Sequence, residues 1–142
     1  MKRLFVYLAP LVVILLCSNA RAQSLDNQER CSLQAKKEYD LWKADQIRLQ
    51  LISSEYQSHF NTKIAKCLML LTADYLEGSN LKYLEDSFER RIYALYSWSP
   101  SSTKKYWEVP PSICELRPST HGKKNCSSVD EFDSFVATYL ED

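Results

Sequence analysis

A histidine and a cysteine stand eight residues apart in the stretch SEYQSHFNTKIAKCLMLL, which runs from Ser54 to Leu71. If this stretch folds back on itself, His59 could approach Cys67 and activate its thiol as a nucleophile. The chain has one further histidine, His121. Three roles are therefore open to Cys67: a catalytic nucleophile, a metal ligand, or one half of a disulfide bond.

The spacing of the cysteines does not favour a metal site. Structural zinc typically has closely paired ligands, as in Cys-x-x-Cys, and every cysteine spacing in this chain is longer. The sequence also lacks the Cys-x-x-Cys-His pattern of covalently attached haem. No spacing selects a mixed site built from His59, His121 and carboxylates. We therefore expect neither a metal ion nor an organic cofactor.

The first residues have the composition of a secretory signal peptide. Two basic residues precede an apolar run at 4–16, and Ala20 and Ala22 occupy the small-residue positions before a cleavage site. The apolar run has 13 residues, whereas a membrane-spanning helix needs about 20. We therefore predict a cleaved leader at 1–22 and a single mature domain at 23–142. This domain is expected to lack a membrane span and to be periplasmic or secreted.

Removal of the leader makes the chain slightly acidic. The full chain has 18 basic and 18 acidic residues, and its first 22 residues contain three basic and no acidic side chains. The mature chain therefore has 15 basic against 18 acidic residues, a net charge of −3. This balance does not favour nucleic acid or an anionic membrane as the partner. The expected partner is an unknown protein or another component of the cell envelope.

Four cysteines remain after the leader is removed, because Cys17 leaves with it. They are Cys31, Cys67, Cys114 and Cys126. An even number of cysteines in a small exported domain is typical of two disulfide bonds, and a free catalytic thiol is uncommon there. Four cysteines allow three pairings.

Helices are predicted at both ends of the mature domain. The segment 28–54 lacks proline and glycine and repeats its apolar residues every three or four positions. Near the C-terminus, Ser128 precedes Glu131 by three residues, which is the pattern of a capping box. The first helix is expected to bury Cys31, Ala35, Tyr39, Trp42, Leu49 and Ile52, with Gln46 as the one polar member, and the second Val129, Phe132, Phe135, Val136 and Tyr139.

The segment 63–77 has two interpretations. Its Ala, Lys, Leu and Met residues favour a helix. With a period of two, however, one face is entirely apolar and the other is mixed, as in a strand with one buried face. We predict a strand that forms a hairpin with residues 56–60. Its apolar face comprises Ala65, Cys67, Met69, Leu71, Ala73 and Tyr75.

The same region carries a pattern that resembles a group of known proteins. Residues 58–71, SHFNTKIAKCLMLL, combine Ser-His-aromatic-Asn with a following Lys-Cys and an apolar run. This pattern resembles one found in small exported proteins of proteobacteria, and the later segments YWEVPPSIC and NCSSVDEFDSFVATYL resemble it more loosely. The resemblance implies an exported location and a strand at the Lys-Cys run, and it implies no activity.

Further strands are expected in the C-terminal half. Aromatic residues alternate along 92–98, which suits a pleated surface. Residues 104–109 are predicted to form a strand that ends at Pro110 and Pro111, because proline cannot donate a ladder hydrogen bond. The predicted fold is therefore α+β: an N-terminal amphipathic helix, a small antiparallel β-sheet, a short C-terminal helix and two disulfides.

This arrangement favours one pairing of the cysteines. Cys31 lies on the apolar face of the first helix and Cys67 on the apolar face of a central strand, so packing the helix on the sheet brings them together. Cys114 and Cys126 bound a loop and would close it at its base. We favour Cys31–Cys67 with Cys114–Cys126 over the other two connectivities, which gives Cys67 a structural role.

The candidate binding residues are aromatic. Tyr96, Trp98, Tyr106 and Trp107 lie within a short span and could form a flat stacking platform for a sugar, a peptide or a partner's loop. The alternative is that these rings are the core of a small sheet.

Signatures of catalysis are mostly missing. With glycine only at Gly78 and Gly122, the sequence has no phosphate-binding loop and no nucleophile elbow. The sequence thus indicates a non-catalytic exported binding module; the alternative is a small hydrolase that uses His59 with nearby carboxylates.

Overall fold

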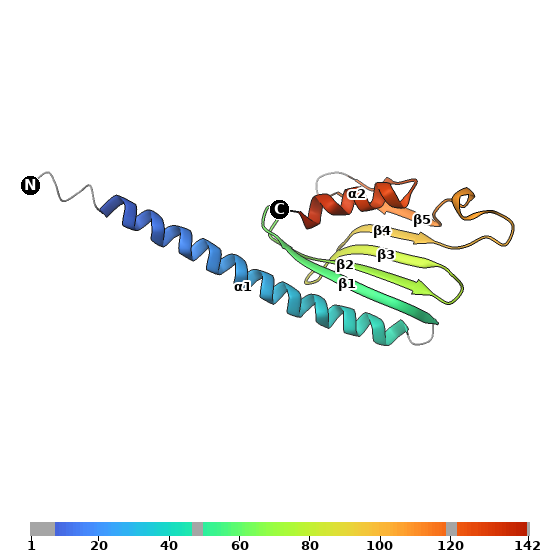
Figure 1. The fold of residues 1–142 in the computed structure, drawn as a ribbon, viewed down its shortest axis with the longest axis horizontal. Coiled ribbons are helices and arrows are strands. Elements are labelled where there is room, and N and C mark those ends of the chain that lie inside the picture. The colour runs from blue at the N-terminus through green and yellow to red at the C-terminus, as the bar shows by residue number, and fades with distance from the viewer. Residues whose placement is uncertain (1–7, 47–49, 119–121, 142) are drawn as a thin grey trace, which may run out of the picture.

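The computed structural model describes residues 8–46, 50–118 and 122–141, and it has two helices and one antiparallel sheet (Figure 1). The six strands follow one another across the sheet in chain order. The predicted α+β architecture is confirmed. In chain order the elements are α1 (Leu8–Asp45), β1 (Leu51–Asn61), β2 (Lys66–Tyr75), β3 (Asn80–Asp86), β4 (Ile92–Trp98), the 3-10 helix η2 (Tyr106–Glu108), β5 (Ile113–Leu116), β6 (Lys124–Asn125) and α2 (Val129–Leu140).

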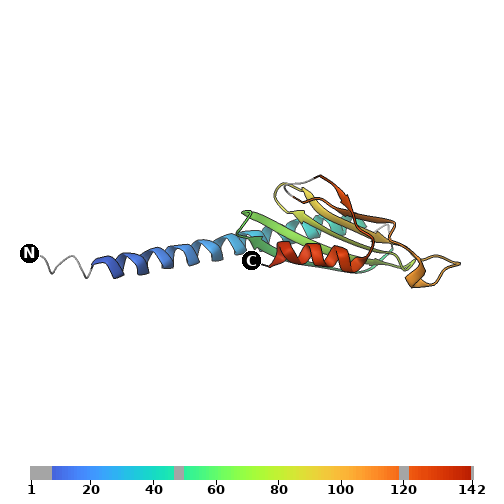
Figure 2. The ribbon, with the colours of Figure 1, turned by 90° about the horizontal axis from the view of Figure 1, so that it is seen from above.

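The two helices pack on opposite faces of the sheet (Figure 2). This arrangement follows from the alternation of side chains along β2. Met69 and Leu71 point to α1, where they contact Ala35, whereas Leu68 points to the cluster around Phe132 of α2. Two small cores therefore share one sheet, and each core is built from a helix and the strands beneath it.

The strand predicted within 63–77 is confirmed as β2, but it is buried on both faces. Cys67, Met69 and Leu71 are at most 2% exposed, as expected for the apolar face. Leu68 on the mixed face is also fully buried, because α2 covers it. The polar residues that made this face look mixed lie toward the ends of the strand, where Asp74 is exposed.

The first helix was expected to continue to residue 54, and this boundary is wrong. α1 ends at Asp45, and β1 begins at Leu51 after Gln50, which has a positive φ of 54°. Ile52, expected on the buried face of the helix, lies in β1 with 63% of its surface exposed. Pairing with β2 outweighs the helical propensity of this segment. Leu49, expected on the same helical face, lies outside the described residues.

α1 also lies along the free edge of the sheet, beside β1 (Figure 1). The side-chain oxygen of Gln28 accepts a hydrogen bond from the backbone N–H of Phe60 at 2.8 Å. The hydroxyl of Tyr39 donates to the backbone oxygen of Ser54 at 2.9 Å. Two backbone groups on the free edge of β1 are thus bonded to side chains of α1.

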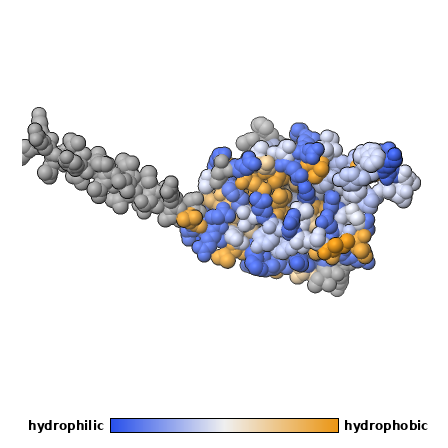
Figure 3. Space-filling view, viewed as in Figure 1, coloured by the Kyte–Doolittle hydropathy of each residue, from blue (hydrophilic) through white to orange (hydrophobic). Residues whose placement is uncertain are grey.

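The backbone of α1 is helical on both sides of the predicted cleavage position at residue 22. The leader at 1–22 and the domain at 23–142 stay predictions. Within the described part of the chain, no helix has both the length and the apolar character that crossing a bilayer requires. On the face drawn in Figure 3, apolar side chains gather in separate patches among polar ones.

The C-terminal half differs from expectation in two elements. β3 was not predicted, although it pairs with both β2 and β4. The strand predicted at 104–109 is wrong: this segment is a loop that contains η2. Prolines at 100, 110 and 111 flank the loop, and each lacks the N–H that a ladder requires. β5 and β6 pair at the base of the loop predicted between the second pair of cysteines, where the N–H of Cys126 donates to the oxygen of Cys114 at 2.9 Å.

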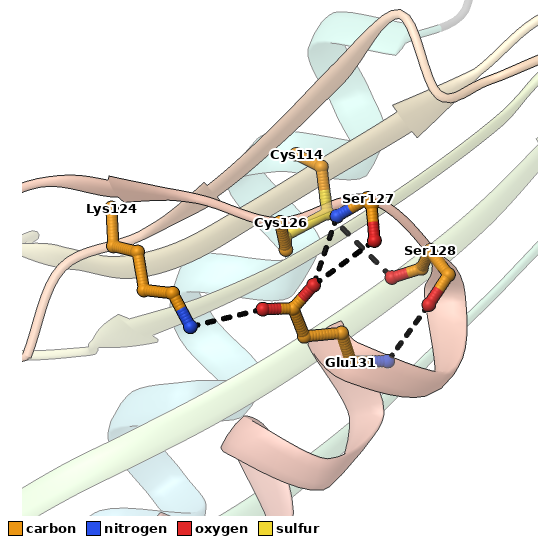
Figure 4. The surroundings of a disulfide bond; sticks show 6 residues. All are labelled: Cys114, Lys124, Cys126, Ser127, Ser128 and Glu131. Atoms are coloured by element: carbon orange, nitrogen blue, oxygen red, sulfur yellow. Dashed lines mark hydrogen bonds and ion pairs between the residues drawn. A yellow bond between two sulfur atoms is a disulfide. The ribbon is translucent and has the colours of Figure 1, made fainter.

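α2 begins with a variant of the predicted capping box. The hydroxyl of Ser128 accepts from the N–H of Glu131 at 3.2 Å, as expected. The carboxylate of Glu131 accepts from the N–H of Ser127 at 3.0 Å, one residue before the position of a standard capping box (Figure 4). This backbone bond, together with Lys124, lowers the pKa of Glu131.

We predict that Ser128→Ala lowers the free energy of unfolding by about 1 kcal/mol, because the N–H of Glu131 loses its acceptor at the start of α2. Chemical denaturation measures the change. Ser134→Ala, an exposed change inside the same helix, is the matched control and should be neutral or slightly stabilising. Equal effects of both substitutions would contradict the role of the cap.

Candidate functional site

All four cysteines of the predicted mature domain form disulfides, and the pairing is the predicted one. The Cα atoms of Cys31 and Cys67 are 5.2 Å apart, and those of Cys114 and Cys126 are 5.0 Å apart. Both sulfurs of the first pair belong to fully or almost fully buried residues. Cys67 therefore joins α1 to β2 and does not offer a thiol for catalysis.

The approach of His59 to Cys67 that a catalytic thiol would require does not occur. In the β1–β2 ladder His59 lies opposite Leu68, and Phe60 lies opposite Cys67. Because neighbouring residues of a strand point to opposite faces, His59 and Cys67 lie on different sides of the sheet. The hydrolase alternative stays an untested prediction. His121 lies outside the described residues, and within these residues no three His, Cys, Asp or Glu side chains are grouped as metal ligands would be.

The four predicted aromatic residues line one groove, which we call the aromatic groove. It has a volume of about 340 Å³ and lies between the end of β4, the loop around η2 and the start of α2. In Figure 1 this loop is at the end of the sheet away from the C-terminus. The groove is lined by Tyr96, Trp98, Tyr106 and Trp107, together with Glu108, Val109, Pro110, Pro111, Ser127, Ser128 and Val129.

The four rings divide into a floor and a rim, and do not form the flat platform that was expected. Tyr96 and Trp98 are 4% and 8% exposed and belong to the core beneath α2, so for these two the core interpretation is correct. Tyr106 and Trp107 are 62% and 75% exposed. The rings of Trp98 and Tyr106 meet at a centroid distance of 4.8 Å and an angle of 56°, which connects floor to rim.

Hydrogen bonds hold the rim loop against the sheet. The indole N–H of Trp98 donates to the backbone oxygen of Val109 at 3.0 Å. Within the loop, the N–H of Lys105 donates to the carboxylate of Glu108 at 3.1 Å. The ammonium of Lys105 lies 5.2 Å from the centre of the Trp107 ring, within the range of a cation–π contact. The exposed rings are therefore carried by an anchored loop.

The groove also contains polar groups. Tyr96 has no hydrogen-bond partner for its hydroxyl within the described residues. Burial raises the pKa of this phenol, so the hydroxyl keeps its proton and can both donate and accept. The hydroxyl of Ser128 accepts from the helix and still has a proton to donate. The site thus combines stacking surface with hydroxyl groups.

Sequence reasoning missed a second pocket at the opposite end of the sheet. Its volume is about 270 Å³, and its lining includes Arg30, Lys66, Asp86 and Glu89. Lys66 pairs with Glu89 and, at 3.4 Å, with Asp86. Three separate segments supply these residues, so their spacing in the sequence contains no signal of the pocket. The two pairs neutralise most of its charge.

A pair of carboxylates lies between α1 and β3. Glu38 of α1 is buried and pairs with Arg90 at 2.9 Å. Glu85 of β3 is partly buried nearby, and burial, followed by the negative charge of Glu38, raises its pKa to about 7. The fold therefore favours the protonated form of Glu85.

This pKa predicts a loss of stability with rising pH. The folded-state pKa of Glu85 is above the ordinary value of 4.5, so its contribution is complete below that value and is lost as pH rises through about 7. Glu85→Gln should remove the loss and raise the free energy of unfolding at pH 8 by about 1 kcal/mol, after allowance for solvent screening. Denaturation at pH 5 and pH 8 tests this. Exposed Glu55→Gln is the control, and identical pH profiles for both variants would contradict the assignment.

Comparison of the chain with models of known protein families, with characterised proteins and with solved structures gives no match.

Proposed function

We propose that this protein is an exported, non-catalytic binding module of the cell envelope, and that the aromatic groove is its recognition site. The observation that carries the proposal is the exposure of Tyr106 and Trp107 on an anchored loop above a buried aromatic floor. Large apolar rings are normally withdrawn from water, and exposed aromatic side chains beside a pocket are typical of recognition sites.

The disulfides support an exported location. Disulfide bonds persist in oxidising compartments such as the periplasm and the outside of the cell, and they are rare in the cytosol. Both bonds of this chain have a structural place: one joins α1 to β2, and the other closes the hairpin of β5 and β6. The leader predicted from the sequence and the resemblance to small exported proteins of proteobacteria agree with this location.

The chemistry of the site favours binding over catalysis. Covalent catalysis by cysteine would need a free thiol, and all four cysteines of the predicted mature domain are bonded in pairs. The polar groups of the aromatic groove are hydroxyls and one carboxylate, Glu108, which already accepts a hydrogen bond from its own loop. Such groups can orient a ligand through hydrogen bonds while the rings supply contact area.

A retention experiment tests the proposal. The purified, tagged protein is incubated with three envelope fractions: periplasmic proteins, membranes and peptidoglycan sacculi. We expect retention by one fraction, and an approximately tenfold loss of retention for Trp107→Ala with an unchanged thermal midpoint, because this side chain contributes contact area and little packing.

Phe88→Ala provides the matched control. Phe88 is also an exposed aromatic residue, at 57%, but it lies at the other pocket. Its substitution should leave retention unchanged. The proposal would be wrong if no fraction retained the protein, or if Trp107→Ala and Phe88→Ala were retained as well as the unaltered chain.

A further inference from the structure

We propose that the ligand of the aromatic groove is an uncharged sugar ring of an envelope glycan. This inference rests on the proposed function and names its ligand class. It is argued from the rings at the rim, from a hydroxyl in the floor that a ligand can reach, and from the balance of donors and acceptors around them.

The rim offers a surface for stacking. Trp107 and Tyr106 are the most exposed aromatic side chains of the described residues, at 75% and 62%. The face of an aromatic ring carries partial negative charge and attracts the polarised C–H groups of a flat apolar surface, such as one side of a sugar ring. Because the loop is tied to the sheet through Trp98 and Val109, the rings are held in place before the ligand arrives.

The floor contains the hydroxyl of a side chain that is otherwise buried. Tyr96 is 4% exposed and lines the groove, and its hydroxyl has no hydrogen-bond partner within the described residues. The hydroxyl is not one of the fully enclosed polar atoms without a partner, so a ligand in the groove can reach it and exchange hydrogen bonds with it. The floor of the groove is therefore prepared to bond a polar group that enters between the rings.

The polar groups match a ligand rich in hydroxyls. The hydroxyls of Tyr96 and Ser128 can each donate, and Glu108 has a second carboxylate oxygen besides the one that accepts from Lys105. A sugar hydroxyl is both donor and acceptor, so each of these groups can bond one. The lining residues include one carboxylate and no lysine or arginine, and the Lys105 ammonium beside the rim lies over the Trp107 ring. This arrangement favours an uncharged ligand over a phosphate or a carboxylate.

A proline-rich peptide fits the groove less well. Its carbonyl groups can accept from the hydroxyls of Tyr96 and Ser128, but proline has no N–H to donate to the carboxylate of Glu108. Two further lining residues, Pro110 and Pro111, have no backbone N–H. The volume of about 340 Å³ is at the small end of the range for ligand pockets, which suits one ring better than an extended segment.

Calorimetric titration with soluble, uncharged oligosaccharides tests the inference. The probes are the trimers of N-acetylglucosamine, of α-1,4-linked glucose and of β-1,4-linked glucose. We expect binding of at least one trimer. Trp107→Ala and Tyr96→Phe should each weaken it about tenfold, the first by loss of stacking and the second by loss of one hydroxyl. Phe88→Ala should bind as the unaltered protein does.

Competition then distinguishes the sources of the sugar. The bound trimer should release the protein from peptidoglycan sacculi if the glycan strands are its target, and from lipopolysaccharide vesicles if the target is a lipid-linked sugar. Release from neither, or binding of none of the trimers, would overturn the inference. If Trp107→Ala still abolished retention by the periplasmic protein fraction, the binding function would stand and the ligand would be a protein.

Tyr96→Phe needs a control for stability, because Tyr96 is part of the core. Thermal midpoints are therefore measured for every variant. If Tyr96→Phe lowered the midpoint, exposed Trp107→Ala would decide the inference, and sugar binding unaffected by that change would contradict it.

Discussion

Replacement of both Cys31 and Cys67 by alanine is expected to lower the free energy of unfolding by about 4 kcal/mol. The bond closes a loop of 36 residues, and in the chain-entropy model a cross-link of this length restricts the unfolded chain by about that amount. A domain of this size is typically stable by about 5–15 kcal/mol, so the variant should be marginal. Guanidinium denaturation under non-reducing conditions measures the change.

The second disulfide provides a comparison of the same kind. Cys114 and Cys126 are separated by 12 residues, and the double alanine variant is expected to lose about 3 kcal/mol. The experiment compares the two losses in free energy of unfolding, and we expect the larger loss for the longer loop. A larger loss for the shorter loop would show that native packing, and not restriction of the unfolded chain, determines what each bond contributes.

Phe132→Ala is expected to lower the free energy of unfolding by about 3–5 kcal/mol, which is the range for removal of a buried ring. Phe132 is fully buried, and its ring lies 5.7 Å from that of Tyr96. The cavity would open where α2 meets β4, so the floor of the aromatic groove should lose support as well. Thermal and chemical denaturation report the stability.

Phe88→Ala removes the same side chain from a site that is 57% exposed. It should change the stability by no more than about 0.5 kcal/mol. The same loss in both variants would contradict the assignment of Phe132 to the core. A loss at Phe132 that left binding at the groove intact would show that the rim loop keeps its position without α2.

The pairing of the cysteines was predictable from the sequence, because it depends on which face of a helix or strand each cysteine occupies and not on where these elements begin and end. Cys31 repeats with Ala35 and Tyr39 on a helical face, and Cys67 alternates with apolar residues of a strand, so one packing step brings the sulfurs together. The start of α2 was predictable because Ser128 and Glu131 are local partners. These features require only short-range periodicity.

Other elements depended on contacts that no short window contains. The end of α1 is set by the pairing of β1 with β2, and β3 is a strand because it has a neighbour on each side. Leu81 and Tyr83 of β3 pack against the cluster beneath α1, whereas Leu84 belongs to the one beneath α2. Because β3 has apolar side chains on both faces, its sequence shows neither a helical period nor an alternation of apolar and polar residues that would have identified the strand.

The aromatic residues that line the groove were predictable from the sequence, but the shape of the groove was not. The composition of the segment indicated Tyr96, Trp98, Tyr106 and Trp107, and these residues do line one groove. Which rings are buried depends on α2, which covers β4 from a distant part of the chain. Residues 104–109 were predicted to form a strand, but between the prolines at 100 and 110 the segment forms a loop.

The bonds between α1 and β1 have a consequence for the behaviour of the protein outside its native surroundings. A long edge strand offers a row of backbone groups on which a strand of another molecule can add, and this is a common route to aggregates and fibrils. Gln28 and Tyr39 occupy such groups near the two ends of the eleven-residue strand β1. Only a short part of β1 is therefore open to pairing with a strand of another molecule. We expect α1 to hinder self-association in addition to covering the core.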